Sequence, residues 1–145
     1  MGYESSRVFD DAWDSIDIYH GPEVFLRTLA GVDRDAALLY AAHFAQSEIC
    51  NGGFAQFFSN STGVLCPEAV SGLKAIGMPG TSALVQEVAL QLFGEPYPRA
   101  RKERKEKLEN IERKILDALN SKFFVLIGSE GGGFEAASNA FILAR

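Results

Sequence analysis

Residues 33–60 read DRDAALLYAAHFAQSEICNGGFAQFFSN, and this stretch predicts the fold class. Its apolar residues recur every three or four positions, the spacing of one helix face. They are Leu38, Ala42, Ala45 and Ile49. Asp33 has a side chain suited to capping the start of this helix, and Asn51-Gly52-Gly53 predicts its end, because Asn and Gly tolerate the left-handed backbone that closes helices. A second helical pattern starts at Phe54 and runs to about Asn60.

The same apolar spacing continues along the rest of the chain. It predicts a first helix that starts at Ser5 or Ser6 and ends at Gly21-Pro22, and one long helix that extends from the charged segment near 100 to Leu119. Further helices are expected at 22–29, 67–76, 81–93 and from 134 onward. No stretch alternates as a strand does, and only 123–127 is ambiguous between helix and strand. We therefore expect residues 1–145 to form a single all-α domain, a compact bundle of about seven helices.

The composition fits a protein of the cell interior. The chain has 145 residues, of which 47% are hydrophobic, enough for one core without covalent cross-links. Cys50 and Cys66 are too few and too far apart for a disulfide framework, so we expect free thiols in a reducing compartment. The sequence contains neither a secretion signal nor an apolar run long enough to span a membrane, which predicts a cytoplasmic protein without membrane contact.

Charge is distributed unevenly around a net charge of −5. Residues 1–50 contain nine acidic and three basic residues, whereas residues 99–114 contain eight basic and four acidic ones. The acidic half would repel phosphate, so direct binding of nucleic acid is not expected. The basic segment has two interpretations: a solvated helix end that projects beyond the core, or a surface for an acidic partner.

Acidic residues gather in the first predicted helix and shortly after it. We take five of them as candidate partner-binding residues: Asp10, Asp11, Asp14, Asp17 and Glu23. The simplest interpretation is a solvated helix face. The alternative is that these carboxylates, together with Asp33 and Asp35, imitate the phosphates of a duplex, which requires that the fold gathers them on one surface.

The segment from Glu48 to Asn60 forms a second candidate site. Its polar and glycine residues are Glu48, Asn51, Gly52, Gly53, Gln56 and Asn60. In a structural interpretation, the carboxylate and the amides bond helix ends and loop backbone while the glycines let two helices meet closely. In a functional interpretation, Glu48, Asn51 and Gln56 are the polar contacts of a small-ligand or peptide pocket.

No motif for catalysis or for metal binding is present. His20, His43, Cys50 and Cys66 lack the tight spacing of a zinc site, and the sequence has no nucleophile elbow and no phosphate loop. Residues 131–133, three glycines before a helix, are interpreted as a hinge, with an anion site as the alternative. We expect no metal and no cofactor, and the sequence favours a non-enzymatic protein.

The pattern E-x-x-N-G-G-F-x-Q-F-F-x-N at 48–60 resembles the signature of a bacterial family of helical domains whose best-described type is a DNA-mimic protein. The likeness continues through Gly63, Glu68-Ala69 and the stretch 73–77 to the segment 116–124. That last segment resembles L-D-x-L-D-x-x-F-Y, with Asn120 in place of the second Asp and Phe124 in place of the Tyr. The resemblance covers roughly residues 30–145.

The resemblance implies a helical intracellular protein without enzymatic activity. In the DNA-mimic type, an acidic surface of a dimer occupies the DNA-binding face of a transcription factor. We therefore expect a non-enzymatic protein-binding module, a homodimer that engages a DNA-binding regulator through its acidic half. The alternative is a small-ligand-binding or hydrolytic domain that uses the Glu48–Asn60 corner.

Overall fold

The computed structural model describes the backbone of residues 3–145 and the side chains from Phe9 onward. Eight α-helices and two 3-10 helices follow one another in this range, which contains no strand. Their bounds are α1 Tyr3–Ser15, α2 Pro22–Ala30, α3 Arg34–Ser59, η1 Ser61–Leu65, α4 Cys66–Ala75, α5 Pro79–Phe93, α6 Arg101–Leu108, α7 Arg113–Ser129, η2 Glu130–Gly132 and α8 Phe134–Leu143. The prediction of an all-α fold is confirmed, and the ambiguous segment 123–127 belongs to α7.

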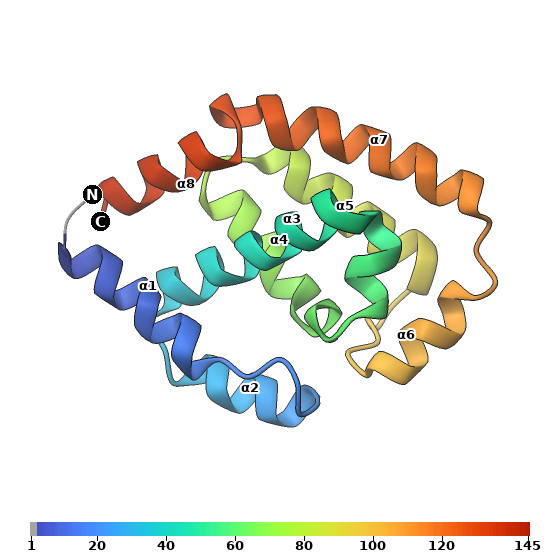
Figure 1. Ribbon diagram of the computed structural model, residues 1–145, viewed down its shortest axis with the longest axis horizontal. Coiled ribbons are helices and arrows are strands. Elements are labelled where there is room, and N and C mark those ends of the chain that lie inside the picture. Colours follow the sequence, from blue (N-terminus) through green and yellow to red (C-terminus); the bar gives the residue numbers. More distant parts are fainter. Residues whose placement is uncertain (1–2) are drawn as a thin grey trace.

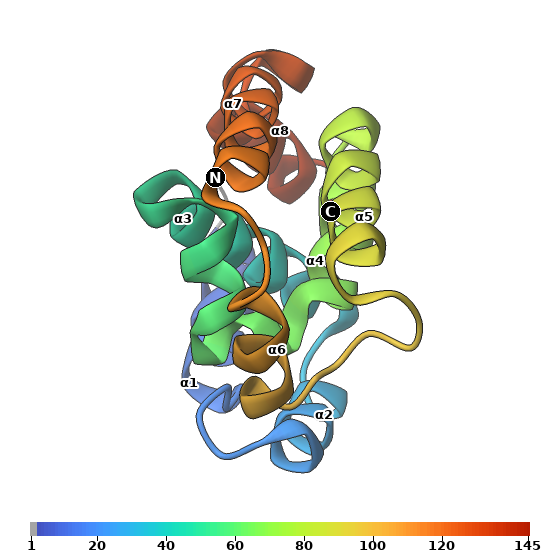
Figure 2. The same ribbon diagram turned by 90° about the vertical axis from the view of Figure 1, so that its right-hand side faces the viewer.

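Helix α3 is the centre of the fold. It contacts α1, α4, α6 and α7, while α4 packs on α5 and α5 on α7. In Figure 1, α7 and α8 extend across the top of the molecule, α1 and α2 lie at the lower left, and α6 lies at the lower right; Figure 2 shows α6 at the end that faces the viewer there. The buried apolar side chains form one hydrophobic core.

A sharp kink divides α3, as the sequence predicts. Asp33 caps the start of the helix by accepting a hydrogen bond from the N–H of Ala36. Gly52 and Gly53 leave the helical conformation, and Gly53 has a φ of +76°, which side chains other than that of glycine rarely allow. The aromatic residues after the kink, Phe54, Phe57 and Phe58, are completely buried.

Helix α1 is shorter than predicted. It ends at Ser15 rather than at Gly21, and Ser5 and Ser6 lie inside it rather than before its first turn. After Ser15 the chain is no longer helical, and Ile16 and Ile18 are both buried in the core. Asp17 therefore lies outside the helix to which the sequence pattern assigned it.

The prediction of one long helix across the basic segment is also wrong. The chain forms two helices, α6 and α7, separated at residues 109–112. Arg104 in α6 is completely buried, so this segment does not project beyond the core. Its carbonyl partners, described below, explain why α6 turns back onto the end of α3.

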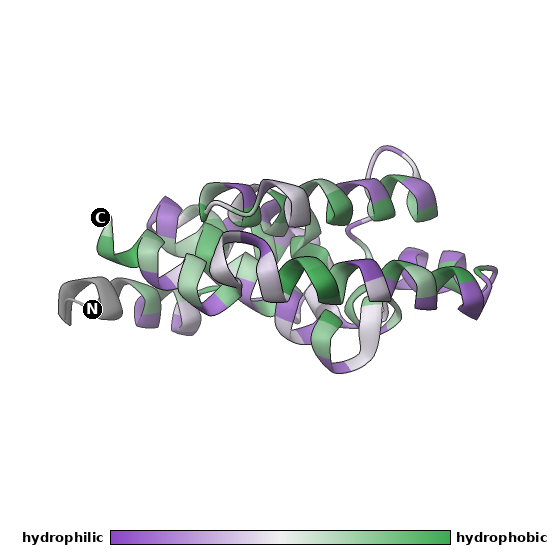
Figure 3. Ribbon diagram, turned by 90° about the horizontal axis from the view of Figure 1, so that it is seen from above, coloured by the Kyte–Doolittle hydropathy of each residue, from purple (hydrophilic) through white to green (hydrophobic). Residues whose placement is uncertain are grey.

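Most of the helices turn a hydrophobic side toward the core and a hydrophilic side toward solvent. Hydrophobic and hydrophilic bands alternate along the ribbons in Figure 3, as expected for helices that share one core. None of the helices in the described part of the chain combines the length and the apolar character needed to cross a bilayer.

Candidate functional site

The acidic candidates on α1 are exposed. Asp10, Asp11 and Asp14 face solvent, and none of them forms an ion pair with any side chain from Phe9 onward. Asp11 and Asp14 line a shallow hollow of about 380 Å³, and Asp33, from the turn between α2 and α3, lines the same hollow. The fold thus brings Asp33 together with carboxylates that lie 19 and 22 residues before it in the chain. We call Asp10, Asp11, Asp14 and Asp33 the acidic face.

Asp17 and Glu23 lie apart from this hollow. Asp17 organises the turn between α1 and α2 by accepting hydrogen bonds from the backbone N–H of Tyr19, at 2.8 Å, and from the His20 ring, at 2.7 Å. These two bonds, the Tyr19 one foremost, lower the pKa of Asp17. Glu23 is exposed in the first turn of α2, where a negative charge meets the positive end of the helix dipole. No contact of the described residues joins either side chain to the acidic face.

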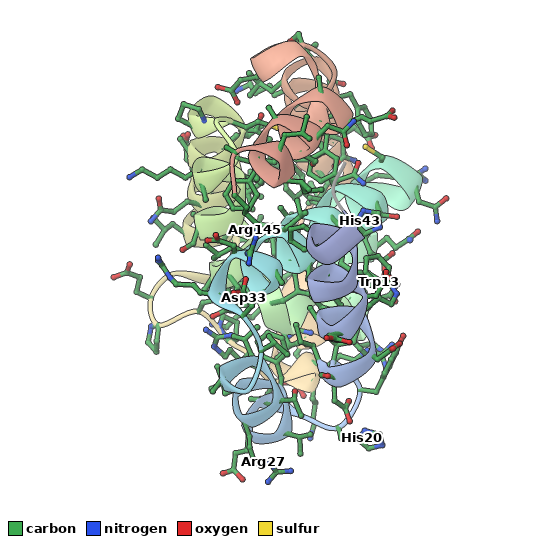
Figure 4. All side chains as sticks on the ribbon, turned by 90° about the vertical axis from the view of Figure 1, so that its left-hand side faces the viewer. Trp13, His20, Arg27, Asp33, His43 and Arg145 are labelled. Carbon is green, nitrogen blue, oxygen red and sulfur yellow. The ribbon has the colours of Figure 1, made fainter. Side chains whose placement is uncertain are left out.

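Arg145 neutralises one edge of the acidic face. Its guanidinium donates to Asp33 at 2.6 Å and to Asp35 at 3.4 Å, and it stacks over the Phe9 ring at 5.9 Å. Figure 4 shows Arg145 directly beside Asp33. Its hydrogen bond to Asp33, followed by the N–H of Ala36, lowers the pKa of Asp33.

The basic segment lies at the other end of the molecule from α1 (Figure 1) and is bound mainly to backbone. Arg99 forms a two-pronged ion pair with Glu68, both bonds at 2.8 Å, which raises the pKa of Arg99. It also donates to the carbonyl of Val64, and Arg101 donates to that of Ser59. These arginines therefore satisfy carbonyls near the end of α3 and do not approach the acidic face.

Arg104 is the most constrained of these cations. Its Nε donates to the carbonyl of Phe58 and its Nη2 to that of Asn60, both at 2.9 Å, and its Nη1 reaches the carbonyls of Pro98 and Arg99. Burial lowers its pKa, and no carboxylate bonds to it among the described residues. Instead, the guanidinium satisfies the last carbonyls of α3, at the negative end of the helix dipole.

The side chains of the Glu48–Asn60 corner bond mainly to one another. Glu48 accepts hydrogen bonds from Gln56, from Thr62 at 3.1 Å and, weakly, from Asn60. Asn51 donates to Gln56 at 3.3 Å. None of these side chains lines any of the four cavities described for this structure. The contacts favour the structural interpretation, in which Glu48 and the amides hold the two halves of α3 at their kink.

Asn120 in α7 completes this corner from a distance of 66 residues in sequence. Its side-chain oxygen accepts a hydrogen bond, 2.8 Å long, from the backbone N–H of Phe54, which lies in the first turn after the kink. The amide of Asn120 also lies against Gly53. Asn120 therefore caps the second half of α3 as an N-cap residue would, although it belongs to another helix.

Three residues that bond these sites were not predicted from the sequence: Arg104, Arg145 and Asn120, the last as a helix cap. No local pattern marks the two arginines, because their partners lie at least five residues away and up to 112 residues away in the chain. Asn120 stands in the segment whose likeness to the family was noted, which is the one signal that could have indicated it.

The cysteines and His43, considered above as metal ligands, differ in their surroundings. The described residues contain no group of three or more His, Cys, Asp or Glu side chains that could hold a metal ion. Cys66 is buried, which raises the pKa of its thiol to about 12, and Cys50 is exposed. His43 is half-buried in an aromatic cluster, where desolvation lowers its pKa.

Comparison with known proteins gives one positive result. The model of the family described as DMP19-like protein matches residues 30–143, from the last residue of α2 to the last of α8. No curated protein and no solved structure matches the chain. The match covers more than half of the chain and includes α3, its kink and the basic segment. The chain therefore belongs to the DMP19-like protein family.

Proposed function

We propose that this protein is a DNA mimic, a non-enzymatic module whose acidic face occupies the DNA-binding surface of a transcription regulator. The observation that carries the proposal is the separation of charge in the molecule. Exposed carboxylates of α1 share one hollow with Asp33, while Arg99, Arg101 and Arg104 of the basic segment are bound to carbonyls at the opposite end. A basic protein surface would thus meet carboxylates that no lysine or arginine of that segment neutralises.

Family membership supports the proposal, because the family's name derives from DNA mimicry. The acidic face has four carboxylates, so it can imitate the phosphates of only a short stretch of a duplex, since duplex DNA carries one charge per ~1.7 Å of axis. A homodimer, which we include in the proposal, would present two such faces. The mass of the protein in solution, measured by light scattering, tests that part separately.

The experiment is affinity capture of DNA-binding proteins followed by competition with duplex DNA. The wild-type chain should capture a protein that itself binds DNA, and added duplex should displace it. The triple variant Asp10→Asn, Asp11→Asn, Asp14→Asn should capture at least tenfold less, since each removed charge weakens electrostatic attraction to a basic surface, a loss of about 1.4 kcal/mol or more.

The matched control is the pair Glu103→Gln and Glu106→Gln in α6, which removes exposed carboxylates at the opposite end. It should leave capture unchanged. Raising the salt concentration should release the partner from the wild-type chain, because exposed charges are screened. Capture that survives high salt, or that duplex DNA does not displace, contradicts mimicry.

A further inference from the structure

We propose that the cavity between α1, α3 and α8 binds a small aromatic amine, with the ring against the cluster of aromatic side chains and the ammonium group at Glu135. The cavity has a volume of about 340 Å³, within the range of small-molecule sites. It is lined by Phe9, Trp13, Ala36, Leu39, Tyr40, His43, Gln46, Phe134, Glu135, Ser138, Asn139 and Ile142.

Aromatic rings form the walls of this cavity. The ring of Trp13 lies 4.9 Å from that of His43 and 5.6 Å from that of Tyr40, and the His43 ring lies 6.3 Å from that of Phe134. Figure 4 shows Trp13 on α1 close to His43 on α3. Trp13 is nevertheless 48% exposed, so a large part of the indole is not covered by protein. Rings in this arrangement favour a flat apolar guest, which gains offset or edge-to-face contacts.

An unsatisfied hydroxyl points to a polar group in the guest. Ser138 Oγ is buried and has no hydrogen-bond partner in the described part of the chain. A buried polar atom without a partner costs free energy, so native structures rarely retain one without a reason. If the hydroxyl turns into the cavity, which Ser138 lines, a ligand with a donor or an acceptor beside its ring would satisfy this atom.

The charges around the cavity favour a cation. Among the lining residues that the structure describes, Glu135 is the one carboxylate, and none is a lysine or an arginine. Desolvation lowers the pKa of His43, so its ring is neutral at pH 7. Arg145 stacks on Phe9, one of the lining residues, but is paired with Asp33 and Asp35. An ammonium group meets a carboxylate and aromatic faces here, whereas an anion meets no positive partner in the lining.

The test compares three ligands that share a phenyl ring: 2-phenylethylamine, 2-phenylethanol and phenylacetate. Each is titrated into the full chain, and binding is followed by calorimetry and by the fluorescence of Trp13, the one tryptophan of the sequence. We expect saturable binding of one amine per chain, at least tenfold weaker binding of the alcohol, and none of the acid. Absence of saturable amine binding, or equal affinity for all three ligands, overturns the proposal.

Two variants locate the site. Ser138→Leu fills the cavity and should abolish binding, whereas Ser71→Leu makes the same change in a separate groove between α4 and α5 and should have no effect. Glu135→Gln changes an exposed side chain, so the fold is retained. It should lower the affinity for the amine about tenfold and leave the affinity for the alcohol unchanged, because only the ionic contact is lost. Full binding by Ser138→Leu, or an equal effect of Glu135→Gln on both ligands, also overturns the proposal. This site is independent of the proposed mimicry, since the titration involves no protein partner.

Discussion

At the scale of single residues, the kink of α3 depends on a glycine that no other residue can replace. Gly53 combines a positive φ with a lack of space, because a Cβ at this position would collide with the side-chain amide of Asn120. Its neighbour Asn120 caps the helix that restarts there. The identity of this corner is therefore decided by backbone conformation as much as by its polar side chains.

Replacement of Gly53 by Ala is expected to destabilise the protein by about 2 kcal/mol or more, since strain and a steric clash act together. Gly128 in α7 is the matched control. It lies in a helix with open space around its Cα, so Gly128→Ala should stabilise the fold by roughly 0.5–1 kcal/mol. Urea unfolding monitored by circular dichroism measures both changes. Equal stability of the two variants would show that the kink tolerates a side chain.

The buried Arg104 allows a second prediction at this scale. Arg104→Met keeps the length of the side chain but removes the guanidinium donor from the buried carbonyl of Phe58 and from that of Asn60, which retains only the N–H of Gly63. We expect a loss of about 3 kcal/mol in the free energy of unfolding. Lys105→Ala, an exposed change one residue away, should stay within about 0.5 kcal/mol of the wild type. A small effect of Arg104→Met would mean that water replaces the guanidinium.

At the scale of elements, helix ends with local signals could be predicted from the sequence, and those with distant partners could not. Asn51-Gly52-Gly53 predicts the kink of α3 correctly, because conformational tolerance is a property of the residues themselves. The extent of α1 and the division between α6 and α7 depend on tertiary packing: on burial of Ile16 and Ile18, and on carbonyls that Arg104 reaches across 46 residues. The same limit applies to the site, whose acidic residues could be named although the meeting of Asp33 with Asp11 and Asp14 could not be foreseen.

The start of α5 provides a pH-dependent prediction. Glu130 accepts the N–H of Gly80 at 2.6 Å and both the N–H and the hydroxyl of Thr81 at 2.7 Å. Desolvation is the largest single influence and raises the pKa of Glu130, but these hydrogen bonds together outweigh it, so the pKa is lowered. The stabilisation is therefore complete above the pKa of the unfolded chain and is lost as the pH falls through the lower pKa of the folded protein.

Glu130→Gln should consequently reduce stability at neutral pH and weaken the dependence of stability on pH in the acidic range. Thermal unfolding at a series of pH values from neutral to about 3 measures this, in a window set by the ordinary Glu pKa near ~4.3. Glu135→Gln, a nearby exposed change without a recorded hydrogen bond, serves as the control. Parallel curves for wild type and Glu130→Gln would contradict the capping role.

At the scale of the whole molecule, opposite charges occupy opposite ends of the long axis. The acidic face lies with α1, and the basic segment closes the far end of α3 (Figure 1). The separation is not complete, since Arg27 lies in α2 and Arg34 begins α3 next to Asp33. The cation that pairs with the acidic face is Arg145, a residue of the C-terminal segment that reaches back to the start of α3. It reduces the charge of the acidic face from within the same molecule.

Arg145→Ala should therefore increase the negative potential of that face. Loss of the guanidinium should raise the pKa of Asp33 toward its ordinary value, because the hydrogen bond from Arg145 is the main cause of its low pKa. Titration of the Asp33 carboxyl group by NMR measures this shift directly, and Asp14, exposed in the same hollow, provides the comparison. An unchanged titration of Asp33 would show that the ion pair is not maintained in solution.

The dependence of α3 on Arg104 also has a consequence for the order in which the chain matures. The carbonyls at the end of the central helix have no guanidinium partner until residues 99–104 have emerged from the ribosome. The hydrogen bonds at the end of α3 therefore form only after this later part of the chain has been synthesised. A chain truncated after residue 98 should be digested by protease at the end of α3, whereas the 145-residue chain, which also supplies the cap from Asn120, should resist there.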